Sequence, residues 1–171
     1  MKINQLKAGA ILSYASLGLG YIISIIYTPI MIRLLGQSEY GLYNLVSSIV
    51  AYLGVLNFGF GSAYMRYYSR YKIVENQEKI ATLNGMFLII FSIIGLIAVI
   101  AGMILALNTD LILGQELTSI ELSKAKTLMM ILVINLGISF PNIVFTSNIT
   151  ANERFIFHRL VQIIRTVINP F

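Results

Sequence analysis

The sequence contains no cysteine at all. This absence excludes disulfide bridges, thiolate metal sites and cysteine nucleophiles in one step. It also removes the usual sequence indicator of a reducing or oxidising compartment.

Charged residues are scarce as well. They make up 11% of the 171 residues, whereas hydrophobic residues make up 57% and the mean hydropathy is +0.82. A soluble domain carries roughly 25% charged residues, so this chain has too little polar side chain to cover a surface that faces water. The composition therefore predicts a membrane protein. The net charge is +5, but the basic residues stand between apolar runs rather than in one patch, so nucleic acid is not a predicted partner.

Long charge-free runs define the predicted membrane spans. A helix needs about 20 apolar residues to cross a hydrocarbon core of about 30 Å, and four runs exceed this length, residues 8–32, 40–65, 80–109 and 127–152. A fifth apolar run occupies residues 155–171, and we expect it to be part of a truncated fifth span. The predicted fold is an all-α, polytopic transmembrane helix bundle.

Basic residues in the connections predict the orientation. One set of alternate connections carries eight lysines and arginines, and the other carries three. The larger set comprises Lys2, Lys7, Arg66, Arg70, Lys72, Lys79, Arg154 and Arg159, and the smaller set comprises Arg33, Lys124 and Lys126. The excess predicts that the N-terminus lies in the cytoplasm.

The first span carries a stripe of small or hydroxylated residues, Ser16, Gly20, Ser24 and Thr28. Such a stripe is typical of close helix packing, which we favour over contact with a substrate. In the short connection that follows, Gly36 suits a helix C-terminus and Ser38 an N-cap. All ten tyrosines lie in the first 71 residues, so the first two spans are the more polar and favour an aqueous path. Packing or interfacial anchoring is the simpler role for any single tyrosine.

The fourth span has a polar centre, formed by Asn135, Pro141, Asn142 and Asn148. Proline removes a backbone donor and kinks or interrupts a helix, and broken helices at membrane depth are a feature of transporters. Function and packing are equally good explanations of this pattern. Arg165 stands among apolar residues of the fifth run, where it either faces a cavity or extends to the cytoplasmic surface.

Catalytic and cofactor motifs are missing. There is no Ser-His-Asp set, no carboxylate pair within a span and no zinc motif, and His158 has no second ligand at a suitable spacing. Gly59 and Gly61 lack the third glycine of a nucleotide-binding loop. The sequence therefore predicts no enzyme, no metal and no cofactor.

Two stretches carry a family resemblance. The first runs from Arg33 to Tyr43, with Pro29 before it, and contains Gly36, Glu39, Tyr40 and Gly41. The second runs from Leu56 to Arg66 and contains Gly59. Together with the turn at residues 151–154, they resemble polysaccharide-exporting members of the multidrug/oligosaccharidyl-lipid/polysaccharide (MATE-like) superfamily. The pattern is more similar to oligosaccharide flippases of the Wzx type than to drug exporters.

This resemblance implies a function for the whole transporter. Such proteins form two lobes in the bacterial cytoplasmic membrane, and they flip an undecaprenyl-pyrophosphate-linked oligosaccharide by alternating access. The chain would then be an incomplete first lobe, with the remainder of the transporter and membrane lipid as its other partners. Arginine matches phosphate oxygens well, so Arg33, Arg66, Arg70 and Arg165 are the candidate substrate contacts. Each of the first three also has an ordinary role, because Arg66 and Arg70 suit a positive-inside anchor and Arg33 suits an ion pair with Glu39.

Two other functions stay open. A drug or cation antiporter of the same superfamily would favour an acidic residue inside the first lobe, whereas all seven acidic residues here lie in connections or at helix ends. A small scaffold or accessory subunit would use the stripe at Ser16–Thr28 to bind other helices.

Overall fold

The computed structural model describes residues 5–57, 59–114, 117–152 and 155–168. Within these ranges the chain forms helices and no strand, which confirms the all-α prediction. In chain order the elements are α1 (Gln5–Leu35), α2 (Gln37–Leu53), the 3₁₀ helix η1 (Gly54–Asn57), α3 (Phe60–Ile73), α4 (Gln77–Leu107), α5 (Thr109–Leu113), α6 (Ser119–Ala151) and α7 (Phe155–Ile168).

Four helical segments are long and apolar enough to cross a membrane, Ile11–Leu35, Gln37–Ile73, Gln77–Leu107 and Ser119–Ala151. They coincide with the four predicted spans, although each helix extends beyond its charge-free run. The protein is thus a multi-pass helical membrane protein. The described part of α7 has 14 residues, fewer than a crossing needs.

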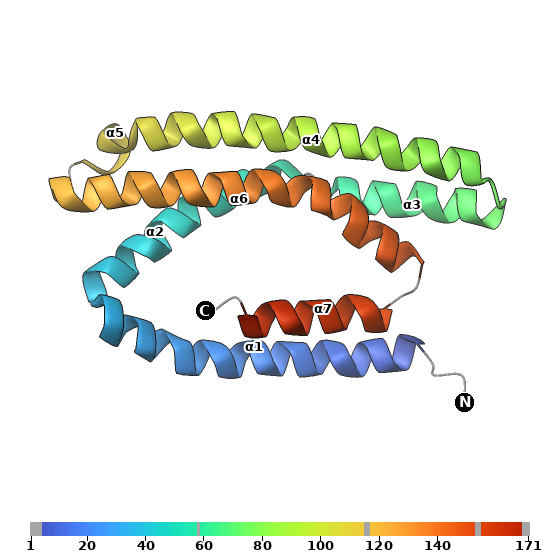
Figure 1. Ribbon diagram of the computed structural model, residues 1–171, viewed down its shortest axis with the longest axis horizontal. Coiled ribbons are helices and arrows are strands. Elements are labelled where there is room, and N and C mark those ends of the chain that lie inside the picture. The colour runs from blue at the N-terminus through green and yellow to red at the C-terminus, as the bar shows by residue number, and fades with distance from the viewer. Residues whose placement is uncertain (1–4, 58, 115–116, 153–154, 169–171) are drawn as a thin grey trace.

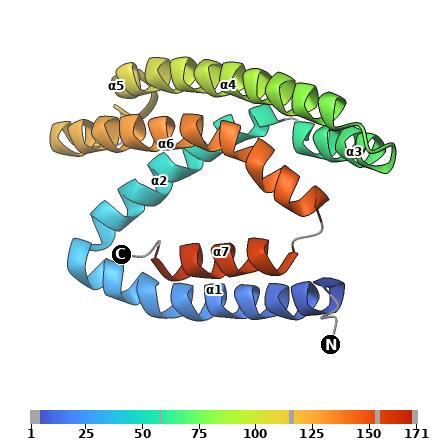
Figure 2. The same ribbon diagram turned by 45° about the vertical axis from the view of Figure 1, so that its right-hand side comes forward.

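The helices form two groups (Figures 1 and 2). α4 and α6 lie side by side and antiparallel, with α3 along the half of α4 that begins the helix. α7 lies along α1 in the same direction, and α2 crosses from the end of α1 to the α4/α6 pair. Successive long segments reverse direction, as a chain that crosses a membrane repeatedly must do.

The predicted second span, residues 40–65, lies within one segment long enough to cross a membrane, but this segment is divided into two helices. α2 passes through the short η1 turn and α3 begins after Gly59, whose φ of 72° lies in the left-handed region that glycine tolerates best. Because the run lacks charge, its composition did not reveal this change of direction. The break divides the span into two halves, α2 and α3. Each half packs at a different end of the α4/α6 pair.

Two hydrophobic clusters correspond to these halves. In the first, Leu42, Val46 and Val50 of α2 pack with residues such as Met129 and Val133 of α6. The second, on α3, α4 and α6, comprises Tyr64, Tyr68, Ile80, Leu83, Phe87, Phe91, Ala98, Phe140 and Val144. Partly buried Leu136 packs against both clusters, and it lies opposite Gly54 at the break.

α4 and α6 approach most closely at glycines. A Cβ atom placed on Gly95 would lie 2.7 Å from the carbonyl oxygen of Gly137, and one placed on Gly102 would overlap a methyl group of Val133. Pro141 has no N–H to bond the Gly137 carbonyl four residues earlier. That carbonyl instead lies against the bare backbone of α4, so proline and glycine together create the contact.

The prolines do not interrupt their helices. α1 continues through Pro29 to Leu35, and α6 continues through Pro141 to Ala151. The broken centre predicted for the fourth span is therefore a bend, visible in the C-terminal half of α6 in Figures 1 and 2. The bend directs the end of α6 toward α7.

Candidate functional site

The small-residue stripe of α1 faces α7. A Cβ atom on Gly20 would lie 3.9 Å from Cγ2 of Thr166, an ordinary van der Waals contact. The predicted packing role is thus supported at Gly20. The same face borders a groove, however, and Ser16, Gly20 and Ser24 all line it. Packing and an exposed polar surface therefore occur on one stripe.

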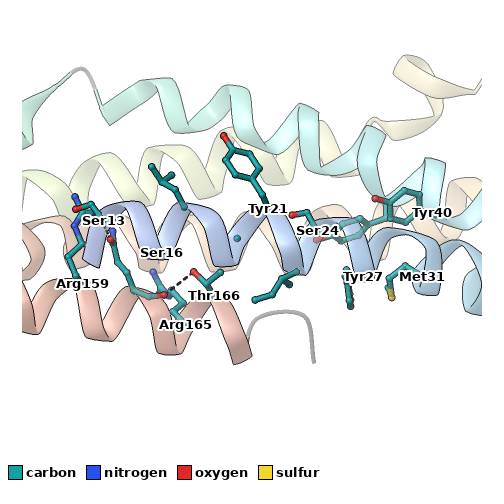
Figure 3. Close-up of a pocket in the computed structure, with 15 residues that line it drawn as sticks. Ser13, Ser16, Tyr21, Ser24, Tyr27, Met31, Tyr40, Arg159, Arg165 and Thr166 are labelled. Atoms are coloured by element: carbon teal, nitrogen blue, oxygen red, sulfur yellow. Dashed lines mark hydrogen bonds between the residues drawn. The ribbon is translucent and has the colours of Figure 1, made fainter. Parts of the chain in front are cut away.

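The groove has a volume of about 830 Å³. It runs along α1 between α7 and the beginning of α2, and Figure 3 shows it with its lining side chains. Its lining comprises Ser13, Ser16, Leu17, Gly20, Tyr21, Ile23, Ser24, Tyr27, Met31, Tyr40, Tyr43, Arg159, Gln162, Arg165 and Thr166. Two of these side chains are cationic and none is acidic.

Both cations come from α7. Arg159 is half-buried and its Nη1 donates a hydrogen bond of 2.6 Å to Oε1 of Gln162. Arg165 lies on the same helix beside Thr166, near Ser16 of α1 (Figure 3). The pairing with Gln162 fixes the guanidinium of Arg159 at the groove wall, while Arg165 is exposed to the groove.

The contact between Gly20 and Thr166 also places Arg165 along α1. Gly20 is the middle residue of the charge-free run 8–32, so Arg165 lies level with the middle of that run. Arg165 lines the groove, which is one of the two positions that the sequence left open for it. Placing an arginine side chain in the hydrocarbon at the centre of a membrane helix costs about 3 kcal/mol or more of free energy. An arginine that faces a polar groove avoids this cost.

The other half of the groove is aromatic. Tyr27 and Tyr40 are half-buried, and Tyr21, Tyr43 and Met31 complete this end. The Tyr40 hydroxyl interacts with the side chains of Thr28 of α1 and Asn44 of α2. Four of the ten tyrosines therefore line one groove.

A family comparison matches nearly the whole chain. The family model described as "Polysaccharide biosynthesis protein" matches residues 6–168. The chain belongs to this polysaccharide biosynthesis protein family. Neither the curated proteins nor the solved structures contain a match to it. The family assignment made from the two motif stretches is confirmed, and the match includes the helix that carries Arg159 and Arg165.

The motif residues of this family member lie mainly at the α1/α2 connection. Gly36 has φ of 85° and links Leu35 to α2, as a helix-terminating glycine does. Glu39 forms an ion pair with Lys124 at the start of α6, so the predicted pairing of Glu39 with Arg33 is not the one observed. Gly41 faces open space, and Tyr40 lines the groove.

Ser38 does not cap α2, contrary to the sequence prediction. Gly36 occupies the N-cap position, and no side-chain hydrogen bond caps the helix. The Ser38 hydroxyl instead donates to Oε1 of Glu121 at 2.6 Å, and Glu121 belongs to a capping box with Thr118. Together with the Glu39–Lys124 pair, this bond fastens the first connection to the beginning of α6.

Three of the four candidate arginines lie outside the groove. Arg33 is exposed near the end of α1, and Arg66 and Arg70 are exposed on α3. The structure therefore brings only Arg165 together with the groove. Within the described residues there is also no group of three potential metal ligands.

The polar residues of α6 have separate positions. Asn135 and Asn142 are exposed, and the Asn142 amide lies 3.5 Å from the carbonyl oxygen of Ile138. Asn148 donates a hydrogen bond of 2.9 Å to the Tyr64 hydroxyl, which itself donates to Oδ1 of Asn84 at 2.5 Å. Asn148 thus joins α6 to α3 and α4 rather than lining the groove.

Sequence reasoning missed Arg159, Gln162 and Tyr27. Arg159 was assigned only to the positive-inside count. A spacing of three or four residues, Arg159, Gln162 and Thr166, places these side chains on one helical face and was a usable signal. The spacing does not show that this face of α7 lines a groove, because that depends on α7 lying along the serine stripe of α1.

Proposed function

We propose that this family member is part of a transporter that flips an undecaprenyl-pyrophosphate-linked oligosaccharide across the cytoplasmic membrane by alternating access. Membership of a polysaccharide biosynthesis family supports the substrate class, and four apolar segments of membrane-spanning length support the location. The observation that carries the proposal is the presence of Arg159 and Arg165 in one groove, with Arg165 level with the middle of the charge-free run 8–32.

The chemistry of the groove suits a phosphate. A pyrophosphate cannot cross hydrocarbon unaided, because each buried polar group without a partner costs several kcal/mol. A guanidinium offers a planar pair of N–H donors to phosphate oxygens. Arg165 lies in a groove with serine, threonine and tyrosine hydroxyls, which replace part of the hydration that the ligand would lose. Arg165 is the phosphate contact in this proposal, and Arg159 is its second cation.

The alternative functions lack comparable support. An antiporter of the same superfamily would favour an acidic residue at membrane depth, and the groove lining contains none. A scaffold would present the serine stripe to another protein, whereas Gly20 on this stripe already packs against α7.

The proposal also includes a further partner, the remainder of the transporter. We expect an in-frame continuation that encodes a second set of spans, and sequencing downstream of the codon for Phe171 tests this.

Complementation tests the phosphate contact. The full gene, with any continuation, is expressed in a bacterial strain that lacks its oligosaccharide flippase, and surface glycan is measured at matched protein level. Arg165→Ala should lower export roughly tenfold or more, because a charge-assisted contact to the phosphate is lost. Arg165→Lys keeps the charge without the planar fork and should be intermediate.

Arg70→Ala is the matched control, since it removes the same side chain from an exposed site outside the groove. It should export glycan at close to the wild-type level. Normal export by Arg165→Ala and by the Arg159→Ala, Arg165→Ala double variant would show that the groove cations do not bind the substrate. Failure of the wild-type gene in flippase-null strains of several glycan types would count against the flippase function itself.

A further inference from the structure

The groove is divided along its length. Arg159, Arg165 and Gln162 lie toward one end, together with Ser13 and Ser16. Tyr27, Met31 and Tyr40 lie toward the other end, as Figure 3 shows. Tyr27 is seven residues beyond Gly20 on α1, which separates it from the level of Arg165 by roughly 10 Å. A ligand that fills the groove therefore meets two different surfaces.

The aromatic end is polar but uncharged. Its lining contains tyrosine and serine hydroxyls, isoleucine and methionine, and neither an acid nor a base. Tyrosine presents an apolar ring face and a hydroxyl that donates and accepts hydrogen bonds. A second phosphate would find no cation here. A pyranose ring has an apolar C–H face and a rim of hydroxyls, and it matches both properties of tyrosine.

We propose that the tyrosine end of the groove is a sugar subsite, in which the glycan of the lipid-linked substrate stacks against Tyr27 and Tyr40. This inference rests on the proposed function and extends it, because it assigns the two ends of one groove to the two halves of the substrate. The pyrophosphate lies against Arg165, and the sugars extend along α1 toward its end at Leu35.

Tyr40 is suited to this role because its hydroxyl already has partners in the protein. Its hydroxyl interacts with Thr28 and Asn44, so binding a sugar would not require the ring to be ordered. An ordered side chain adds affinity by avoiding an entropic cost. Stacking depends on the apolar C–H face of a pyranose and not on one particular pattern of hydroxyl groups. The subsite should therefore accept related sugars.

Binding to two synthetic probes tests the inference. The full product of the gene is purified in detergent, and its affinity is measured for undecaprenyl pyrophosphate and for the same carrier with an N-acetylglucosamine disaccharide. The wild type should prefer the glycosylated probe. Tyr27→Leu and Tyr40→Leu should each weaken binding of that probe roughly fivefold to tenfold, the effect of one lost aromatic contact, and should leave the bare carrier within roughly twofold. Tyr27→Phe, which keeps the ring, should retain most of the affinity.

Tyr52→Leu is the control, because Tyr52 belongs to α2 but is 78% exposed and lies outside the groove lining. It should bind both probes as the wild type does. Equal wild-type affinity for the two probes would overturn the sugar subsite, and so would equal losses for both probes in the tyrosine variants. The phosphate contact has a separate readout, because Arg165→Gln should weaken both probes by the same factor. If it weakens neither while the tyrosine variants behave as expected, the phosphate assignment fails and the sugar subsite stands.

Discussion

Tyr64 shows how much a single side chain can organise in this protein. It is fully buried, and its ring lies against Tyr68 and Phe87. Its hydroxyl stands between Asn84 of α4 and Asn148 of α6, donating to one and accepting from the other. One phenol oxygen therefore connects three helices. In a membrane interior, where water is absent, these bonds also give partners to polar groups of Asn84 and Asn148.

We predict that Tyr64→Phe lowers the free energy of unfolding by about 1 kcal/mol, the usual scale for a hydrogen bond between membrane helices. The ring packing is retained, so the loss reports the hydroxyl alone. Thermal unfolding of the purified protein in detergent measures the change. Tyr52→Phe removes a hydroxyl from a 78% exposed ring and should have little effect. Equal losses in the two variants would contradict a specific role of the Tyr64 bonds.

The pairing of α4 with α6 determines the fold at the scale of elements. Gly95, Ala98, Gly102 and Ala106 are all buried and follow one face of α4. Small residues allow two membrane helices to approach closely, since lipid supplies no hydrophobic force that would drive the helices together. The sequence predicts close helix packing for the small-residue stripe of α1. The closest contact lies instead on α4, where the same pattern was present and was not recognised.

Gly95→Ala should reduce the free energy of unfolding by about 1–3 kcal/mol, a typical cost of overpacking. The new methyl group would lie 2.7 Å from the Gly137 carbonyl oxygen, and a backbone atom cannot easily move away. Gly85→Ala is a matched control on the same helix, because nothing lies within 4 Å of its Cβ position. It should be neutral or stabilising by up to about 1 kcal/mol through helix propensity. Thermal unfolding in detergent distinguishes the two, and similar melting temperatures would argue against the close contact.

The whole molecule consists of a main bundle, α2 to α6, and the α1/α7 pair. These two parts are joined through Gly36 and through the end of α6, and the groove lies where α7, α1 and the beginning of α2 meet. The alternating directions of the long segments in Figure 1 agree with repeated membrane crossings. They place the α3/α4 turn and the α4/α6 connection on opposite sides. The distribution of lysine and arginine predicts that the first of these faces the cytoplasm.

Cysteine labelling tests this orientation directly, because the chain has no cysteine of its own. Val74, in the α3/α4 turn, is 70% exposed, and Leu111, beyond α4, is 84% exposed. Leu111→Cys should react with a membrane-impermeant maleimide in intact cells, whereas Val74→Cys should react only after permeabilisation. The opposite pattern would reverse the predicted topology. Reaction of both residues in intact cells would contradict the separation of the two connections by a membrane.

The predictions from sequence succeeded where local chemistry decides the outcome. Four charge-free runs gave four spans, and Gly36 ended a helix as expected. Prediction failed where the partner of a side chain belongs to a distant part of the chain. The pairing of Glu39 with Lys124 and of Ser38 with Glu121 joins residues more than eighty positions apart, and nothing in the first connection identifies those partners.

The sequence by itself determined the helical, membrane-spanning character of the protein and its family. In hydrocarbon every backbone group must be bonded within its own segment, so an apolar run of sufficient length has to be helical. Tertiary structure alone decided which helices meet, where the second span changes direction, and that Arg159 and Arg165 share a groove with the tyrosines of α1 and α2. The physical reason is that lateral packing in a membrane depends on the shapes and polar groups of facing helices, and hydropathy along the chain contains no record of which faces meet.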